Sequence, residues 1–151
     1  MDIRVRPAVE SDLSSIMPSF GPRGDPPWDP FDSLERLRTI PRDGLLVAEV
    51  DGEFAGFVHW FPVTETDADG TTHRWARIYN LFVAEPQRRK GVGRSLMTAA
   101  LRQIVDGGFE YVRIDTSDGN EAARRLYEQL GFDVTDRGVQ YRIRLEAPVQ
   151  R

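Results

Sequence analysis

The chain contains no cysteine among its 151 residues. This absence excludes disulfide bonds, thiolate metal ligands and any mechanism that proceeds through a cysteine nucleophile. Histidine is scarce as well, because only His59 and His73 are present. Two imidazoles cannot complete a three-ligand catalytic zinc site without carboxylates. His59 lies in an apolar run and His73 beside a hairpin signal, so we expect structural roles for both and no metal.

Long hydrophobic runs and an excess of positive charge are also missing. No apolar run approaches the roughly 20 residues needed to cross a bilayer, and residues 1–5 carry no signal-peptide core. We therefore expect a cytoplasmic protein without membrane contact. The net charge is −4, which argues against non-specific binding to nucleic acid, since that binding relies on basic surfaces. The remaining composition, with 40% hydrophobic and 29% charged residues, is ordinary for one globular domain.

The spacing of apolar residues predicts alternating strands and helices. Strands are expected at residues 3–6, 45–50, 54–63, 74–83 and 111–115, with a closing hairpin at 134–135 and 139–145. Helices are expected at about 10–17, 31–40, 91–105 and 118–130, and a proline- and glycine-rich loop at 20–30. Hairpin turns are expected at Asp51-Gly52 and at residues 67–70. This order predicts an α/β chain with one mixed sheet and helices on both faces.

The most informative stretch is the sequence RRKGVGR at residues 88–94, which we call the glycine turn. An apolar strand precedes it, and a helix with apolar residues at i, i+3, i+4 and i+7 follows it. Glycines allow backbone N–H groups to approach a ligand closely, and a helix N-terminus favours negative charge. The glycine turn therefore predicts a pocket for a pyrophosphate group, with a solvated basic turn as the alternative.

Two common phosphate-binding loops do not fit the glycine turn. It lacks the final Gly-Lys-Ser/Thr of a P-loop, so it has no lysine and hydroxyl for a nucleotide γ-phosphate and its magnesium ion. It also lacks the third glycine of a dinucleotide fingerprint, because Leu96 stands at that position. A pyrophosphate-containing ligand other than ATP or NAD remains.

Two motifs carry a resemblance to a known family. The first is RRKGVG at residues 88–93, following the strand end LFV at 81–83. The second is NEAARRLY at residues 120–127, continuing to Gly131-Phe132. In this order and between these elements, they resemble the GCN5-related N-acetyltransferase (GNAT) superfamily over nearly the whole chain. The resemblance is weakest at residues 14–40, and Pro86 stands one position later than is usual in the family.

The resemblance implies a single-domain α/β (α+β) fold with a mostly antiparallel mixed sheet that is splayed at its centre. It implies acetyl-CoA as co-substrate, without a metal. The main chain of the strand end would pair with the pantetheine arm, and a backbone N–H near Val83 would face the thioester oxygen. Asn120 would contact the cofactor or simply begin a helix. The implied cofactor-binding residues are Leu81, Phe82, Val83, Arg88, Arg89, Lys90, Gly91, Val92, Gly93, Arg94 and Asn120.

The family position of Tyr127 implies a hydroxyl that protonates, or donates a hydrogen bond to, the departing sulfur. A core residue is the alternative, because Tyr127 lies on an apolar helix stripe. The base that takes the proton of the amine is less defined. Asp115, at a strand end, occupies the position of the glutamate base in one branch of the family. A turn residue is the alternative for Asp115, and Tyr79 or a water chain could take its place.

The acceptor implied by the family is a primary amine, and a small molecule, a lysine or a peptide N-terminus all remain open. The absence of cysteine fits direct attack by the amine within a ternary complex. A homodimer also remains open. The region expected to frame the acceptor comprises residues 20–40 and 63–75, with an acidic and aromatic set formed by Asp25, Trp28, Asp29, Phe31 and Asp32. The alternative function is a non-catalytic acyl-CoA-binding or sensing domain.

Overall fold

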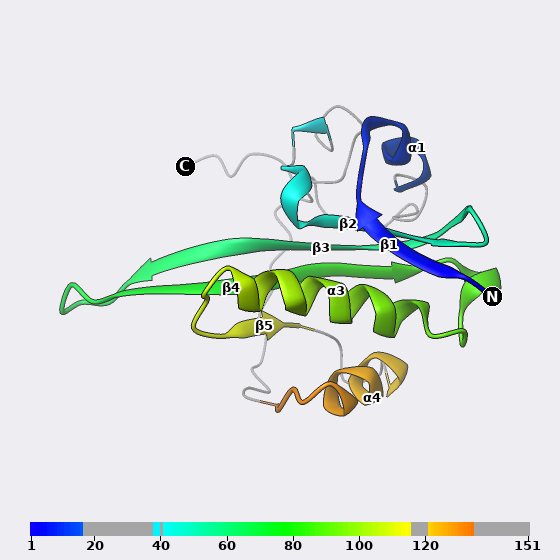
Figure 1. Ribbon diagram of the computed structural model, residues 1–151. Coiled ribbons are helices and arrows are strands. Elements are labelled where there is room, and N and C mark those ends of the chain that lie inside the picture. The colour runs from blue at the N-terminus through cyan, green and yellow to red at the C-terminus, as the bar shows by residue number, and fades with distance from the viewer. Residues whose placement is uncertain (17–37, 40, 116–120, 135–151) are drawn as a thin grey trace, which may run out of the picture. The chain divides into compact units, whose positions relative to one another are not determined.

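A computed structural model describes residues 1–16, 38–39, 41–115 and 121–134 of the chain (Figure 1). Contacts divide the chain into two compact units, residues 1–117 and 118–151, and each is described by itself. The loop expected at residues 20–30, nearly all of the helix expected at 31–40 and the final hairpin lie outside the described residues. None of the described helices is long and apolar enough to span a membrane.

The first unit is built on a five-stranded sheet in the order β1-β2-β3-β4-β5. Neighbouring strands run antiparallel except for β4 and β5, which are parallel. This confirms the mixed, mostly antiparallel sheet. The strands are β1 (Ile3–Pro7), β2 (Leu45–Val50), β3 (Glu53–Thr66), β4 (Thr72–Val83) and β5 (Val112–Ile114).

The two predicted hairpin turns are confirmed. Asp51 and Gly52 join β2 to β3 with φ angles of 50° and 85°, the pair of positive values that suits the twist of a two-residue hairpin. The second turn holds residues 67–70 between β3 and β4, where the Asp67 carbonyl accepts from the Gly70 amide. Both flanking strands extend further toward this turn than predicted, because threonines 66 and 72 continue the pairing.

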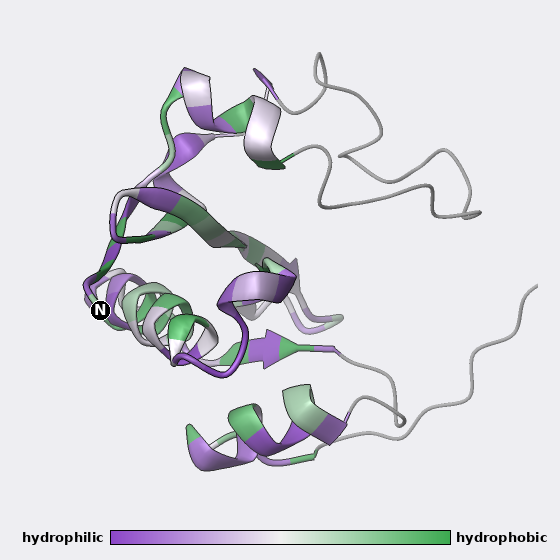
Figure 2. Cartoon of the chain, turned by 90° about the vertical axis from the view of Figure 1, so that its right-hand side faces the viewer, coloured by the Kyte–Doolittle hydropathy of each residue, from purple (hydrophilic) through white to green (hydrophobic). Residues whose placement is uncertain are grey.

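Helices cover both faces of the sheet, as the sequence predicted (Figures 1 and 2). The long helix α3 (Val92–Asp106) packs on one face, and η1 (Glu10–Asp12) with α1 (Leu13–Ile16) packs on the other. Short 3-10 turns, η3 (Arg42–Gly44) and η4 (Glu85–Gln87), precede β2 and follow β4. The second unit contains α4 (Glu121–Gln129), within the helix predicted from residue 118.

Alternation along the strands divides the core into two layers. Toward α1, buried side chains form a cluster of Ala8, Leu13, Ile16, Leu45, Val47 and Phe57. Toward α3, the helix contributes Val92, Leu96, Met97, Ala100 and Ile104, all buried. Leu96, which replaces the third glycine of a dinucleotide fingerprint, is fully buried. The site of interest therefore lies on a sheet that is packed from both sides.

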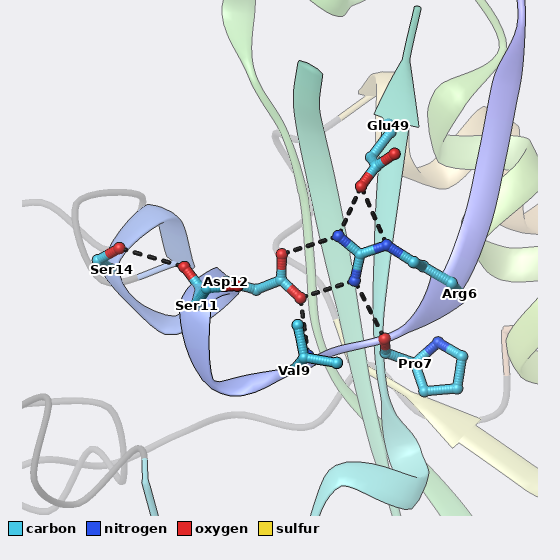
Figure 3. A network of polar contacts seen from close by, with 7 residues as sticks. All are labelled: Arg6, Pro7, Val9, Ser11, Asp12, Ser14 and Glu49. Atoms are coloured by element: carbon cyan, nitrogen blue, oxygen red, sulfur yellow. Dashed lines mark hydrogen bonds and ion pairs between the residues drawn. The ribbon is translucent and has the colours of Figure 1, made fainter. Parts of the chain in front are cut away.

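An ion-pair network ties the first helical turn to the sheet (Figure 3). The Arg6 guanidinium donates to both carboxylate oxygens of Asp12, at 2.7 and 2.9 Å, and to Glu49 on β2 at 2.5 and 3.0 Å. Asp12 also accepts from the Val9 amide at 2.7 Å. These hydrogen bonds, those from Arg6 above all, hold the pKa of Asp12 below its usual value. The carboxylate is therefore charged at neutral pH and fixes α1 to β1 and β2.

Gly56 allows β3 and β4 to approach closely, and this gives a prediction about stability. A Cβ at this position would overlap the carbonyl oxygen of Phe82. We expect Gly56→Ala to lower the free energy of unfolding by about 2–3 kcal/mol, because neither backbone can yield without breaking the ladder. Urea unfolding curves measure the loss.

The control for that experiment is Gly52→Ala in the β2–β3 turn. Gly52 has a positive φ of 85° but no heavy atom within 4 Å of a new Cβ. Only backbone strain of about 1 kcal/mol is expected there. A loss at Gly56 that is no larger than the loss at Gly52 would contradict the close approach of the two strands.

Candidate functional site

The parallel strands β4 and β5 part after a short stretch of pairing. They pair only at Ala76–Ile78 with Val112–Ile114. Among the described residues, the rest of β4, residues 79–83, has no strand on that side. A register shift in the β3–β4 ladder at His59/Trp60 accompanies the split and gives β4 one extra residue, Tyr79, between Ile78 and Asn80. The splay that the family resemblance implies is present, and the bulge accompanies it.

The open edge of β4 presents main-chain groups of two residues. The Ala84 amide donates to the Ala55 carbonyl at 2.8 Å, so the backbone groups of Ala84 point toward β3. Because these groups alternate in direction along a strand, the N–H and C=O of Phe82 also point toward β3. The same groups of Leu81 and Val83 are therefore directed to the open side. Phe82, expected to present its main chain as well, instead pairs with Phe57 of β3 and stacks on its ring. For Phe82, the expected main-chain role does not fit this alternation.

The glycine turn follows directly on the open edge. The Arg88 guanidinium donates through Nε to the Val83 carbonyl oxygen at 3.1 Å, which joins the two features. Gly91 is the N-cap of α3 with a left-handed φ of 87°, and no side chain caps the helix. Amides in the first turn of a helix have no acceptor within the helix. Together with the helix dipole, they make this end of α3 suited to an anion.

A strained backbone and a set of cations mark the same turn. Arg89 has a φ of 65°, a left-handed conformation that is uncommon for a residue with a side chain and is found at ligand sites. Arg88, Arg89 and Lys90 are exposed, and the Lys90 ammonium donates to Gln87 at 3.1 Å. Val92 is buried and anchors the start of α3. The structure thus brings the predicted residues 88–94 together in one cationic turn beside the open edge.

Asp115 lies just beyond β5, where it is held by two arginines. Its carboxylate accepts from Arg77 of β4 at 2.9 Å and from Arg113 of β5 at 3.5 Å. About half of the Asp115 side chain is exposed. The sequence placed Asp115 at a strand end, as observed, but gave no sign of its two partners. A role as base requires that one of its oxygens be released from an arginine.

Tyr127 belongs to the second unit and is described within it. The side chain is half-buried on α4, and its ring lies 6.0 Å from the ring of Phe132. Burial raises the pKa of the Tyr127 phenol, so the hydroxyl stays protonated at neutral pH and can donate a hydrogen bond. Asn120, expected to contact the cofactor, lies outside the described residues.

The two histidines have different surroundings. His59 is buried on the α1 side of the sheet, next to the Phe61 ring. Burial lowers the pKa of His59 to about 4, so its imidazole is neutral at pH 7. His73, near the β3–β4 turn, contacts Asp67 at 2.6 Å and Glu110 at 3.3 Å, and Asp67 raises its pKa. Both environments are compatible with the structural roles expected from the sequence.

Only part of the expected acceptor region can be described. The acidic and aromatic set Asp25, Trp28, Asp29, Phe31 and Asp32 lies outside the described residues. Within the described part of the chain, no group of three or more histidine, aspartate and glutamate side chains could hold a metal ion. The described features that bear on chemistry are the open edge of β4, the glycine turn and the cluster around Asp115.

Comparison with known proteins identifies relatives of this fold. A mycothiol acetyltransferase of Nocardiopsis dassonvillei is 38% identical over 104 residues, which cover 66% of this chain and 30% of that protein. The chain thus spans less than a third of that relative. The uncharacterized N-acetyltransferase YhfO of Bacillus subtilis is 33% identical over 96% of this chain and 99% of its own length.

A solved structure shows the same fold. AAC(6')-Iy, an aminoglycoside N-acetyltransferase in complex with a CoA-containing bisubstrate analogue, superimposes with a TM-score of 0.74 at 22% identity. The match covers 96% of this chain and all of that one. The family model described as "Acetyltransferase (GNAT) family" matches residues 9–132. The match includes β2 to β5, the glycine turn and α4, so the chain belongs to the GNAT family of acetyltransferases.

Proposed function

We propose that this chain transfers an acetyl group from acetyl-CoA to a primary amine by direct attack within a ternary complex. One observation carries the proposal: the open edge of β4, at Leu81 and Val83, is joined through η4 and the Arg88–Val83 hydrogen bond to the uncapped start of α3. An extended chain of amides that ends in a pyrophosphate has the chemistry to occupy both features at once. Membership in an acetyltransferase family and the CoA moiety held by AAC(6')-Iy support this ligand.

The cofactor would be held mainly by main-chain groups. The pantetheine amides would extend the sheet as an added strand along Leu81 and Val83. The pyrophosphate would accept hydrogen bonds from the amides of the glycine turn, with the exposed cations of residues 88–90 nearby. Asn120 would contribute near the pantetheine. In this arrangement the thioester lies beside the point where β4 and β5 part.

The reaction requires a nucleophile, an oxyanion donor and a proton at sulfur. The amine nitrogen attacks the thioester carbon, a C–N bond forms, and the C–S bond breaks. The Val83 amide is proposed to stabilise the oxyanion, because the ladder directs its N–H to the open side. Tyr127 is proposed to hydrogen-bond the departing sulfur, which ends as the CoA thiol. The amine loses one proton to a base.

We assign that base to Asp115, and its replacement gives a testable prediction. An alkylammonium has a pKa near 10.4, so it must be deprotonated before attack at neutral pH. We expect Asp115→Asn to lower kcat/KM by about 10–100-fold at pH 7 and much less near pH 10, where the free amine is abundant. The pH–rate profile measures this difference. Asp106→Asn, at the exposed end of α3, is the matched control.

An unaltered profile for Asp115→Asn would assign the base to another group, such as Tyr79 or a water chain. The acceptor itself remains defined only as a primary amine: a small molecule, a lysine or a peptide N-terminus.

Transfer is tested with the full chain, acetyl-CoA and a broad panel of amines, by following release of free thiol. Thiol release that depends on the amine, with an acetylated product of matching mass, would support the proposal. A thermal shift with acetyl-CoA but no release with any amine would instead favour a non-catalytic acyl-CoA sensor. Absence of any shift would reject the cofactor site.

A further inference from the structure

Two arginines face each other across the last pairs of β4 and β5. Arg77 and Arg113 are direct partners in the parallel register, and we call them the arginine pair. Like charges placed directly opposite on neighbouring strands are unfavourable. Here they share a single carboxylate, that of Asp115. The cluster therefore carries one positive charge more than it neutralises.

Among the described residues, the contacts of the arginine pair use only a small part of its hydrogen-bonding capacity. A guanidinium has five N–H donors. Arg77 uses one nitrogen at 2.9 Å, and Arg113 makes only a 3.5 Å contact through Nε, at the limit of a hydrogen bond. Glu110, the acidic residue preceding β5, is engaged by His73 and by the Arg74 amide. The remaining donors are thus available for a further anion.

Aromatic rings back both guanidinium groups. The Arg77 guanidinium carbon lies 5.6 Å from the centre of the Tyr79 ring, and that of Arg113 lies 5.9 Å from the Trp75 ring. Trp75 in turn stacks on Tyr111, with centroids 5.4 Å apart. Stacking on rings restricts the flexible arginine side chains. The donors are therefore partly pre-oriented, as a binding site requires.

The arginine pair lies on the sheet face away from α3. Trp60 hydrogen-bonds Gln103 of α3 at 2.8 Å and pairs with Ile78, so Ile78 faces α3 and the adjacent Arg77 faces the opposite side. Arg77 also directly precedes the last β4–β5 pair, beyond which the edge of β4 is open. The arginine pair therefore lies beside the split, on the face opposite to α3.

From these observations we infer that the acceptor amine also carries a carboxylate or phosphate group, which the arginine pair binds. The inference rests on the proposed function and defines the acceptor more narrowly. Asp115 occupies the anion position in the absence of substrate. When the acceptor anion takes up the arginine donors, the Asp115 carboxylate is released and can accept the proton of the amine.

A purely structural role of the cluster explains less. Exposed ion pairs contribute between about 0 and 1 kcal/mol, and side-chain exposure is 36% for Arg77, 55% for Arg113 and 51% for Asp115. A single arginine would suffice to neutralise Asp115. The second cation adds repulsion unless an anionic ligand is bound.

The test compares matched amines that differ in one anionic group. One arm uses L-alanine against L-alaninamide, and the other uses O-phosphoethanolamine against ethanolamine, so the arms distinguish a carboxylate from a phosphate. We expect the wild-type chain to prefer the anionic member of at least one arm by about tenfold or more in kcat/KM. Arg77→Gln and Arg113→Gln should each remove most of that preference, which is measured within each variant as the ratio of kcat/KM for the anionic and the uncharged member.

Arg102→Gln, which removes an exposed arginine from α3, is the control and should keep the preference. Equal use of charged and uncharged amines, or a preference that both arginine variants retain, would overturn the inference while the proposed function stands. Absence of transfer to every amine would overturn the proposed function and the inference together.

Discussion

Replacing Gly93 with glutamate should abolish acetyl-CoA binding while leaving the fold intact. Gly93 is the second residue of α3, where a carboxylate interacts favourably with the helix dipole. The variant is therefore expected to be at least as stable as the wild type. The same carboxylate would stand where the pyrophosphate is proposed to bind. At roughly 5 Å and an effective dielectric constant of about 20, two like charges repel by about 3 kcal/mol.

That repulsion alone corresponds to a loss of affinity of more than about 100-fold. Calorimetric titration with acetyl-CoA measures it, and urea unfolding verifies that the helix is intact. Gly93→Ala is the control, because it adds a methyl group without charge and should retain most of the affinity. Unchanged affinity in Gly93→Glu would remove the pyrophosphate from the start of α3.

Replacing Tyr127 with phenylalanine should lower kcat by about 100-fold and change acetyl-CoA affinity less than about threefold. Reference pKa values are about 10 for tyrosine and 8.5 for a thiol, so full proton transfer to the thiolate is uphill by about 2 kcal/mol. Burial raises the pKa of Tyr127 further, which favours a hydrogen bond to the sulfur over complete transfer. Loss of one such donor in the transition state typically lowers kcat by about 10²–10³-fold.

Phenylalanine retains the ring that packs near Phe132, so the unfolding curve should change little. Single-turnover kinetics with saturating acetyl-CoA separate the chemical step from binding. Full activity of Tyr127→Phe would assign the residue to the apolar stripe of α4 alone.

Much of the fold follows from local signals in the sequence. The Asp51-Gly52 turn has the positive φ angles that this dipeptide predicts. Gly91, within the glycine turn, is the residue directly before α3. The bulge on β4 could not be predicted from the pattern of residues in the strand. Residues 75–83 are nearly all apolar or aromatic, so an extra residue leaves no visible break in their alternation.

The parts of the candidate site that are formed by residues adjacent in the sequence could be predicted. The glycine turn and its position before a helix are local features, and they lie together in the structure. The arginine pair depends on the parallel register between strands separated by α3, and no spacing in the sequence encodes that register. Asp115 was placed correctly at a strand end, but its shorter ion pair comes from Arg77, which is 38 positions away.

The extra residue on β4 also limits how this chain can diversify. Arg77 and Asn80 lie on the same side of the sheet although they are three positions apart, because Tyr79 is inserted between the paired residues. Deletion of Tyr79 would restore a regular ladder and leave both faces unchanged, because Ile78 would still pair with Trp60 and Arg77 with Phe61. Loss or gain of one residue in the regularly paired parts of β4 would instead exchange the two faces, so changes in the length of this strand are confined to the bulge.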